Sequence, residues 1–206
     1  MRATRDAFHL DPASIHGVLA CQAGEDAGRV REILAKAAAL GGLEAGDLPP
    51  LMAVEDPQLL EELFRAARSI KEAIYGGRIV LFAPLYVSNL CANECLYCAF
   101  RASNRTLPRK ALSQEEIAEE VRHLLRQGQK RLLLVSGEAY PQEGLDYILR
   151  SIRTVYATRE GHGAIRRLNV NIAPLSTEQF RRLGAEGIGT YQLFQETYHQ
   201  PTYATM

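Results

Sequence analysis

The spacing of apolar residues changes character partway along the chain. In the first part, apolar side chains recur every three or four positions, in one stripe over residues 30–38 and another over residues 59–70. This spacing is typical of amphipathic helices. We therefore expect residues 1–77 to form an N-terminal helical extension, with residues 43–51 as a proline-containing linker between its two main helices.

After this extension, short apolar runs alternate with amphipathic helical stretches. Strands are predicted over residues 78–88, 130–136, 167–173 and 188–196, and helices over residues 113–128, 141–159 and 176–184. Ser113 and Glu116 have the spacing of a capping box at the start of the first of these helices. Because helices separate the strands, the strands should be parallel and joined by right-handed crossovers. The predicted fold class is therefore α/β, a parallel (β/α) barrel.

Only about four βα units are visible within the 206 residues, whereas a closed barrel of eight units takes about 250 residues. We therefore expect residues 78–206 to be the N-terminal half of a larger barrel. On its own, the fourth strand would leave an unpaired edge and a half-open cavity facing water. Either a second chain supplies the missing half or the sequence is a fragment, and we favour the fragment.

Composition and charge exclude several classes of partner. Hydrophobic residues make up 47% of the chain and charged residues 23%, which is ordinary for a soluble globular protein. The 24 basic residues balance 24 acidic ones, so no long-range field draws nucleic acid to the surface. The longest apolar stretch, residues 79–87, is far shorter than the roughly 20 residues of a membrane helix. The opening residues do not resemble a signal peptide, and we expect a cytoplasmic protein without a membrane partner.

Three of the four cysteines form a C-x3-C-x2-C triplet. Cys91, Cys95 and Cys98 follow the first predicted strand on one loop. Three thiolates can bind three irons of a [4Fe–4S] cube, whose usual complement is four cysteines, and this leaves one iron open to a small ligand. The alternatives are a structural zinc site, for which the neighbouring sequence offers no fourth ligand, and buried cysteines without a metal. The remaining cysteine, Cys21, is expected to be a core residue of a helix.

Other polar residues follow the later strands. In a parallel barrel the reactive groups gather at the C-terminal ends of the strands. Ser136, Gly137 and Glu138 end the second strand, and Asn171 lies on the polar face of the third. That face should point into the barrel, where asparagine can line a ligand cavity or satisfy neighbouring backbone groups. Glu196 ends the fourth strand and needs a hydroxyl or a cation to bind.

A basic stretch follows the cysteines. Residues 101–110 carry four positive charges. Because a cluster bound by three thiolates is anionic, neighbouring cations would steady it and ease its reduction. The alternative is that these side chains belong to a solvated loop.

The cysteine spacing, with Tyr97 just before the last cysteine, resembles that of the radical S-adenosylmethionine (SAM) superfamily. Together with KRLLLVSGE and IGTYQLFQETYH, it resembles the radical SAM tyrosine lyases over roughly residues 25–203. Within that family the likeness is closest to the maturase that makes carbon monoxide and cyanide for [FeFe]-hydrogenase. The 2-iminoacetate synthase of thiamine biosynthesis is a related enzyme.

The resemblance implies two cofactors, a [4Fe–4S] cluster bound by the three cysteines and SAM at its open iron. Glu138 with Gly137 would hold the SAM amino group, and Glu196 would contact the ribose. The SAM contacts implied in this way are Tyr97, Ser136, Gly137, Glu138, Asn171 and Glu196. No catalytic residue is assigned.

The implied reaction is that of a radical SAM carbon–carbon lyase. An electron donor such as ferredoxin or flavodoxin would reduce the cluster, which cleaves SAM to methionine and a 5′-deoxyadenosyl radical. That radical would take a hydrogen from the amino group of tyrosine, and the Cα–Cβ bond would break to give p-cresol and dehydroglycine. The alternatives are a truncated, non-catalytic module that binds a cluster, the 2-iminoacetate synthase, and a radical SAM enzyme for another amino acid.

Overall fold

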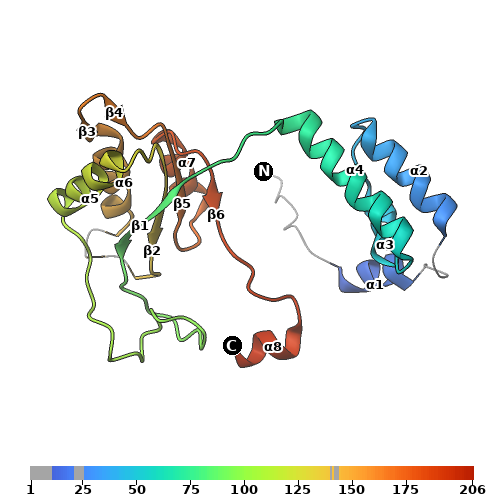
Figure 1. Ribbon diagram of the computed structural model, residues 1–206. Coiled ribbons are helices and arrows are strands. Elements are labelled where there is room, and N and C mark those ends of the chain that lie inside the picture. The colour runs from blue at the N-terminus through green and yellow to red at the C-terminus, as the bar shows by residue number, and fades with distance from the viewer. Residues whose placement is uncertain (1–10, 21–25, 140, 142–143) are drawn as a thin grey trace, which may run out of the picture. The chain divides into compact units, whose positions relative to one another are not determined.

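The computed structural model describes residues 11–20, 26–139, 141 and 144–206 (Figure 1). Backbone contacts divide the chain into two compact units, Met1–Ile79 and Val80–Met206. Cys21 lies outside the described residues, so its expected place in a core stays a prediction.

The first unit is helical. Its elements are α1 (Pro12–Ala20), α2 (Ala27–Ala38), the short 3-10 helix η1 (Ala45–Asp47), α3 (Leu48–Met52) and α4 (Pro57–Tyr75). The side chains of Asp26 and Asp56 cap α2 and α4 by accepting hydrogen bonds from the first turn. The two apolar stripes meet: Val30 and Ile33 of α2 and Leu59 of α4 are buried where these helices contact.

The prediction of a linker over residues 43–51 is wrong, because this segment contains η1 and most of α3. Its organising group is the buried side chain of Asp47. The carboxylate accepts hydrogen bonds from Lys36 Nζ at 2.7 Å and from the Glu44 backbone N–H at 3.0 Å. The Glu44 hydrogen bond, followed by that of Lys36, lowers the pKa of Asp47. The prolines that suggested a linker lie in the first turn of α3, where a missing N–H costs little.

Helix α4 is the longest of the described helices, and charged side chains recur along it. Its apolar residues form a stripe rather than a continuous surface. Among the described residues, no helix combines the length and the apolar character needed to cross a membrane.

The second unit contains a four-stranded parallel sheet in the order β1-β2-β5-β6. The strands are β1 (Ala83–Ser88), β2 (Arg131–Ser136), β5 (Arg167–Asn171) and β6 (Tyr191–Gln192). Helices α5 (Gln114–Arg126), α6 (Leu145–Ala157) and α7 (Thr177–Ala185) connect successive strands and pack on one face of the sheet (Figure 1). The short helix α8 (Gln200–Thr205) follows β6. This is the predicted α/β arrangement of successive βα units.

The alternation of side chains along the strands separates the two faces of the sheet. Val170 of β5 is buried in the core beneath the helices, whereas Asn171 lies on the opposite face and is half-buried. Tyr86 of β1, Val135 of β2 and Gln192 of β6 lie in the same cross-strand row as Asn171. The polar face of the third strand is therefore turned away from the helices, as its alternation predicts.

The last strand is much shorter than predicted, because only β6 forms within residues 188–196. Among the described strands β6 pairs with β5 alone, so no neighbour on its other side extends the ladder. Residues 193–199 have no regular structure. Glu196 therefore lies beyond the end of the strand rather than at its last position.

The remaining differences lie at the ends of elements. The first strand begins at Ala83 rather than at residue 78. The helix predicted over residues 141–159 is observed as α6, and residues 142–143 lie outside the described part of the chain. A small antiparallel hairpin of β3 (Arg159–Glu160) and β4 (Gly163–Ala164) follows α6 and was not predicted. Two-residue strands of this kind carry too little apolar pattern to be recognised.

Candidate functional site

The cysteine loop, residues 89–112, leads from β1 toward α5. Its three cysteines, Cys91, Cys95 and Cys98, are free and half-buried. The Cys98 backbone N–H donates to the Cys95 carbonyl at 3.0 Å, which closes a turn between the second and third cysteines. The Phe100 backbone N–H donates to Cys98 Sγ at 3.4 Å. A sulfur that accepts such a bond is well suited to bind metal as a thiolate, because these bonds offset its negative charge.

The cysteine loop lies directly against the end of β2. Gly137 donates its backbone N–H to the Ser88 carbonyl at 3.0 Å, and Ala139 donates to the Leu90 carbonyl at 3.1 Å. A Cβ atom on Gly137 would lie 2.2 Å from the Leu90 carbonyl oxygen and 3.2 Å from Cys91 Cβ. Only glycine permits this approach. The backbone that leads into Cys91 thus occupies the space that a side chain at residue 137 would need.

Glu138 reaches the cysteine loop through a residue that the sequence did not single out. Its Oε2 accepts a hydrogen bond from Asn93 Nδ2 at 2.7 Å, and Asn93 lies between the first two cysteines. Glu138 is exposed, whereas Ser136 before it is buried and donates to the Gly137 carbonyl at 3.1 Å. The Glu138 carboxylate is therefore directed to the cysteine loop and retains lone pairs that can accept from an ammonium group.

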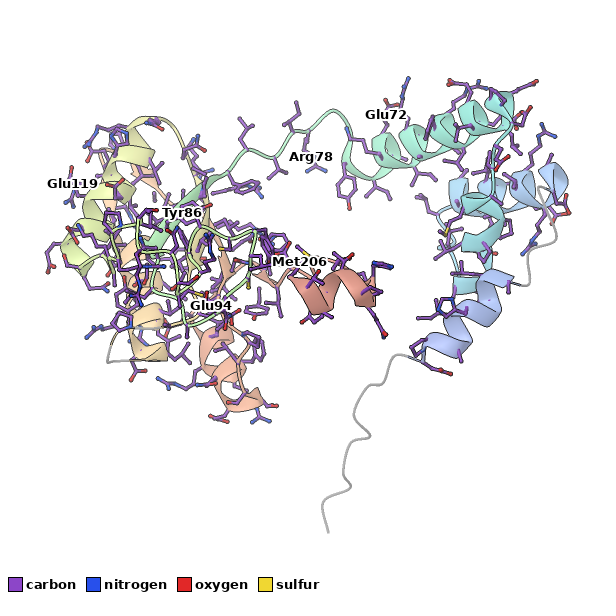
Figure 2. All side chains as sticks on the ribbon, turned by 90° about the horizontal axis from the view of Figure 1, so that it is seen from below. Glu72, Arg78, Tyr86, Glu94, Glu119 and Met206 are labelled. Carbon is purple, nitrogen blue, oxygen red and sulfur yellow. The ribbon has the colours of Figure 1, made fainter. Side chains whose placement is uncertain are left out.

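Tyr97 and Glu196 meet on the other side of the loop. Desolvation, followed by the interaction with the Glu196 carboxylate, raises the pKa of Tyr97. The Leu96 backbone N–H donates to the Met206 carbonyl at 2.9 Å. In Figure 2, Met206 accordingly lies beside the cysteine loop, which carries Glu94. The segment after β6 is thus joined to the loop by the hydrogen bond between Leu96 and Met206.

Asn171 and Tyr191 lie on the neighbouring strands β5 and β6. Asn171 Nδ2 donates to the Gln192 carbonyl at 3.0 Å, so its amide satisfies a neighbouring backbone group, which was the alternative to a ligand contact. Tyr191 donates its hydroxyl to the Ile172 carbonyl at 3.0 Å. Desolvation raises the pKa of Tyr191, and the negative charge of Glu138 raises it further. Tyr191 pairs with Val170 and packs against the core beneath the helices, so it lies on the face of the sheet opposite Asn171.

The three thiols can be compared with the two kinds of metal site that the sequence allows, a zinc site and a [4Fe–4S] cluster. Among the described residues, no three His, Cys, Asp or Glu side chains gather around a position for a single metal ion. A tetrahedral zinc site requires such convergence, because every sulfur lies about 2.3 Å from one ion. In a [4Fe–4S] cube each thiolate binds a different iron, so the sulfurs need not meet at one point. Three thiols on one loop therefore suit a cluster better than a mononuclear site.

A basic pocket lies at the opposite, amino-terminal ends of the strands. It encloses about 490 Å³ and is lined by Lys130, Arg131, Arg166, Arg167, Tyr156 and the backbone of residues 187–189. None of the three loop cysteines lines it. The candidate cofactor residues are thus separated from this pocket by the length of the sheet.

Comparison with known proteins finds a matching family and several similar proteins. The model of the Radical SAM superfamily matches residues 85–204. A crystal structure of HydG, described as a maturase of the [FeFe]-hydrogenase, is 46% identical with a TM-score of 0.89, over 95% of this chain and 43% of that one. HydG from Carboxydothermus hydrogenoformans is 36% identical with a TM-score of 0.71, over 97% and 47%. The 2-iminoacetate synthase of Escherichia coli (strain K12) is 35% identical over 162 residues, 79% of this chain and 41% of the relative.

A parallel α/β sheet with three thiols on its first βα loop defines a protein that can hold a metal cluster at the carboxyl ends of its strands. The chain belongs to the radical SAM superfamily. Proteins of this superfamily use a [4Fe–4S] cluster and SAM. The chain spans less than half the length of the three relatives described above.

The close packing at Gly137 gives a testable result. In Gly137→Ala the new methyl group must displace the Leu90 carbonyl, so we expect the free energy of unfolding of the metal-free chain to fall by about 1–3 kcal/mol. The matched control is Gly184→Ala, because Gly184 lies in α7 with nothing within 4 Å of an added Cβ. That control should be neutral or stabilising by up to about 1 kcal/mol. Urea unfolding measures both changes, and equal stability of the two variants would contradict the packing argument.

Proposed function

We propose that this chain is the cofactor-binding part of a radical SAM carbon–carbon lyase that acts on tyrosine. The products would be p-cresol and dehydroglycine, as in the synthesis of carbon monoxide and cyanide ligands for [FeFe]-hydrogenase. The observation that carries the proposal is the cysteine loop, with three free thiols directly after β1, in a chain 46% identical to a HydG structure.

In this proposal Cys91, Cys95 and Cys98 each bind one iron, and the fourth iron stays open for SAM. When bound and reduced, the cluster supplies the electron that cleaves SAM to methionine and a 5′-deoxyadenosyl radical. The chain itself holds the three thiols on one loop, orients SAM and limits competing reactions. The half-buried position of the thiols supports this role, since a cluster there is reachable by an electron donor such as ferredoxin or flavodoxin.

The proposed SAM site is built from the ends of β2 and β5 and from the segment after β6. Glu138, held toward the loop by Asn93, would accept hydrogen bonds from the SAM amino group beside Gly137. Glu196, whose carboxylate acts on the neighbouring Tyr97, would accept hydrogen bonds from the ribose hydroxyls. The two remaining proposed contacts, Ser136 and Asn171, now bond to backbone carbonyls and would support the site from β2 and β5.

A second candidate is a 2-iminoacetate synthase, which the 35% identity to the Escherichia coli enzyme favours. Both candidates begin with cleavage of tyrosine and differ in the later use of the small product. A non-catalytic module that only binds a cluster is the third possibility. It shares the cysteine loop but would not cleave SAM.

Cysteine variants test the cluster. Anaerobic reconstitution of the chain should load about four irons per molecule. We expect Cys91→Ser, Cys95→Ser and Cys98→Ser each to reduce iron content at least several-fold, because each removes the thiolate of one iron. Cys21→Ser, at the only cysteine outside the triplet, is the matched control and should load fully. Iron and zinc are measured by elemental analysis, and a wild-type chain that takes up one zinc and no iron would contradict the proposal.

The substrate is tested by assaying the reduced, reconstituted protein with SAM, with and without tyrosine. The assay uses the 206-residue chain and, where its gene encodes a longer protein, that protein as well, because the relatives are longer. We expect tyrosine to increase 5′-deoxyadenosine formation and p-cresol to appear, both followed by chromatography with mass detection. A full cluster without SAM cleavage in either protein would favour the non-catalytic module. Stimulation by a different amino acid and not by tyrosine would identify another radical SAM reaction.

A further inference from the structure

The guanidinium group of Arg109 binds several backbone carbonyls of the cysteine loop. Arg109 Nη1 donates to the carbonyl of Asn89 at 2.8 Å and to that of Phe100 at 2.7 Å. Arg109 Nη2 donates to the carbonyls of Arg101 and, at 3.2 Å, Asn104. Asn89 precedes the three cysteines and Phe100 follows them. A single side chain therefore joins the two ends of the segment that carries the thiols.

The backbone of Arg109 is itself fixed beside the end of β1. Asn89 Oδ1 accepts a hydrogen bond from the Lys110 backbone N–H at 2.7 Å, and Asn89 Nδ2 donates to the Pro108 carbonyl at 2.7 Å. The Asn89 backbone N–H also donates to the Lys110 carbonyl at 3.1 Å. Three hydrogen bonds thus hold the residues on either side of Arg109 against Asn89. From this anchor the Arg109 side chain extends to the far end of the loop.

Only arginine can make these four contacts together. Its guanidinium carries five N–H donors in a rigid planar fork, whereas the lysine ammonium carries three donors around one atom. Hydrogen bonds from a charged donor are also stronger than neutral ones. The Arg109 side chain is half-buried, so the carbonyls that it binds are only partly available to water. Losing the fork would leave several of them poorly satisfied.

We propose that Arg109 is the positioning residue of the cysteine loop, which it holds closed so that Cys91, Cys95 and Cys98 are presented together before any cluster is bound. This inference rests on the proposed role of the loop in binding a cluster. Ordering a loop costs conformational entropy, and a loop that is ordered in advance does not have to meet this cost when it binds its ligand.

This role differs from that of a general positive charge near the cysteines. Arg105 lies in the same loop and is exposed, and no hydrogen bond or ion pair of its side chain is found within the described part of the chain. Arg105 and Arg109 would contribute similarly if only charge mattered. If the fork matters, Arg109→Lys keeps the charge but loses the function, whereas Arg105→Lys changes little.

The first experiment uses the metal-free, reduced chain and amide hydrogen exchange followed by mass spectrometry. In Arg109→Lys we expect amides of residues 89–104 to exchange at least about tenfold faster than in the wild type. The reason is that local opening of the loop no longer requires the hydrogen bonds of the guanidinium group to break. The matched control, Arg105→Lys, should exchange at the wild-type rate. Exchange in α6 should stay unchanged in both variants. Equal loop exchange in the two variants, or faster exchange throughout the second unit in Arg109→Lys, would overturn the proposal.

The second experiment measures the cluster itself. After anaerobic reconstitution, Arg109→Lys should hold less iron than Arg105→Lys, and its reduced EPR signal with SAM should be broadened by several loop conformations. In a further variant, Arg109→Ala, added methylguanidinium should restore slow loop exchange and iron loading, whereas methylammonium should not. Wild-type iron loading and an unchanged EPR signal in Arg109→Lys would overturn the proposal. If the wild type binds no cluster, the proposed function fails, while the hydrogen-exchange comparison still tests the loop.

Discussion

The arrangement of the candidate site depends on one contact, the backbone pairing that continues from β1 and β2 into the loops beyond them. Gly137 pairs with Ser88 and Ala139 with Leu90, so the first cysteine begins where this pairing ends. A side chain at residue 137 would collide with the Leu90 carbonyl, which makes the absence of a Cβ a condition of the geometry. Because Glu138 lies within the paired segment, its carboxylate is delivered to the cysteine loop by the sheet rather than by a flexible loop.

Much of the fold could be predicted because its local and tertiary signals agree. The apolar run of β2 and the alternation of β5 predict strands, and both strands pair in parallel as the helices between them require. The capping box of Ser113 and Glu116 is present, with Glu116 accepting from the Ser113 backbone N–H at 2.9 Å. The predictions of a linker over residues 43–51 and of a long last strand were wrong for different reasons. The buried side chain of Asp47 organises the predicted linker, and β6 has no second neighbour among the described strands.

The candidate site could be predicted in part. The C-x3-C-x2-C spacing marks Cys91, Cys95 and Cys98 as candidate ligands without help from the fold, because all three cysteines lie within eight residues. Asn93 and Arg109 were missed as individual contributors. Their roles depend on which carbonyl or carboxylate the folded chain brings to them, and residue spacing does not encode that. Arg109 was noticed only as one of four charges, whereas in the structure its hydrogen-bonding shape distinguishes it from Arg105.

The central claim is that three thiols anchor a four-iron cluster and leave one iron free to bind SAM. Mössbauer spectroscopy of the chain reconstituted with ⁵⁷Fe tests this most directly, because it resolves irons in different coordination. We predict that SAM changes the signal of about one quarter of the iron and leaves the remainder, with its thiolate ligands, nearly unaltered. A spectrum in which every iron is unaffected by SAM would contradict the account.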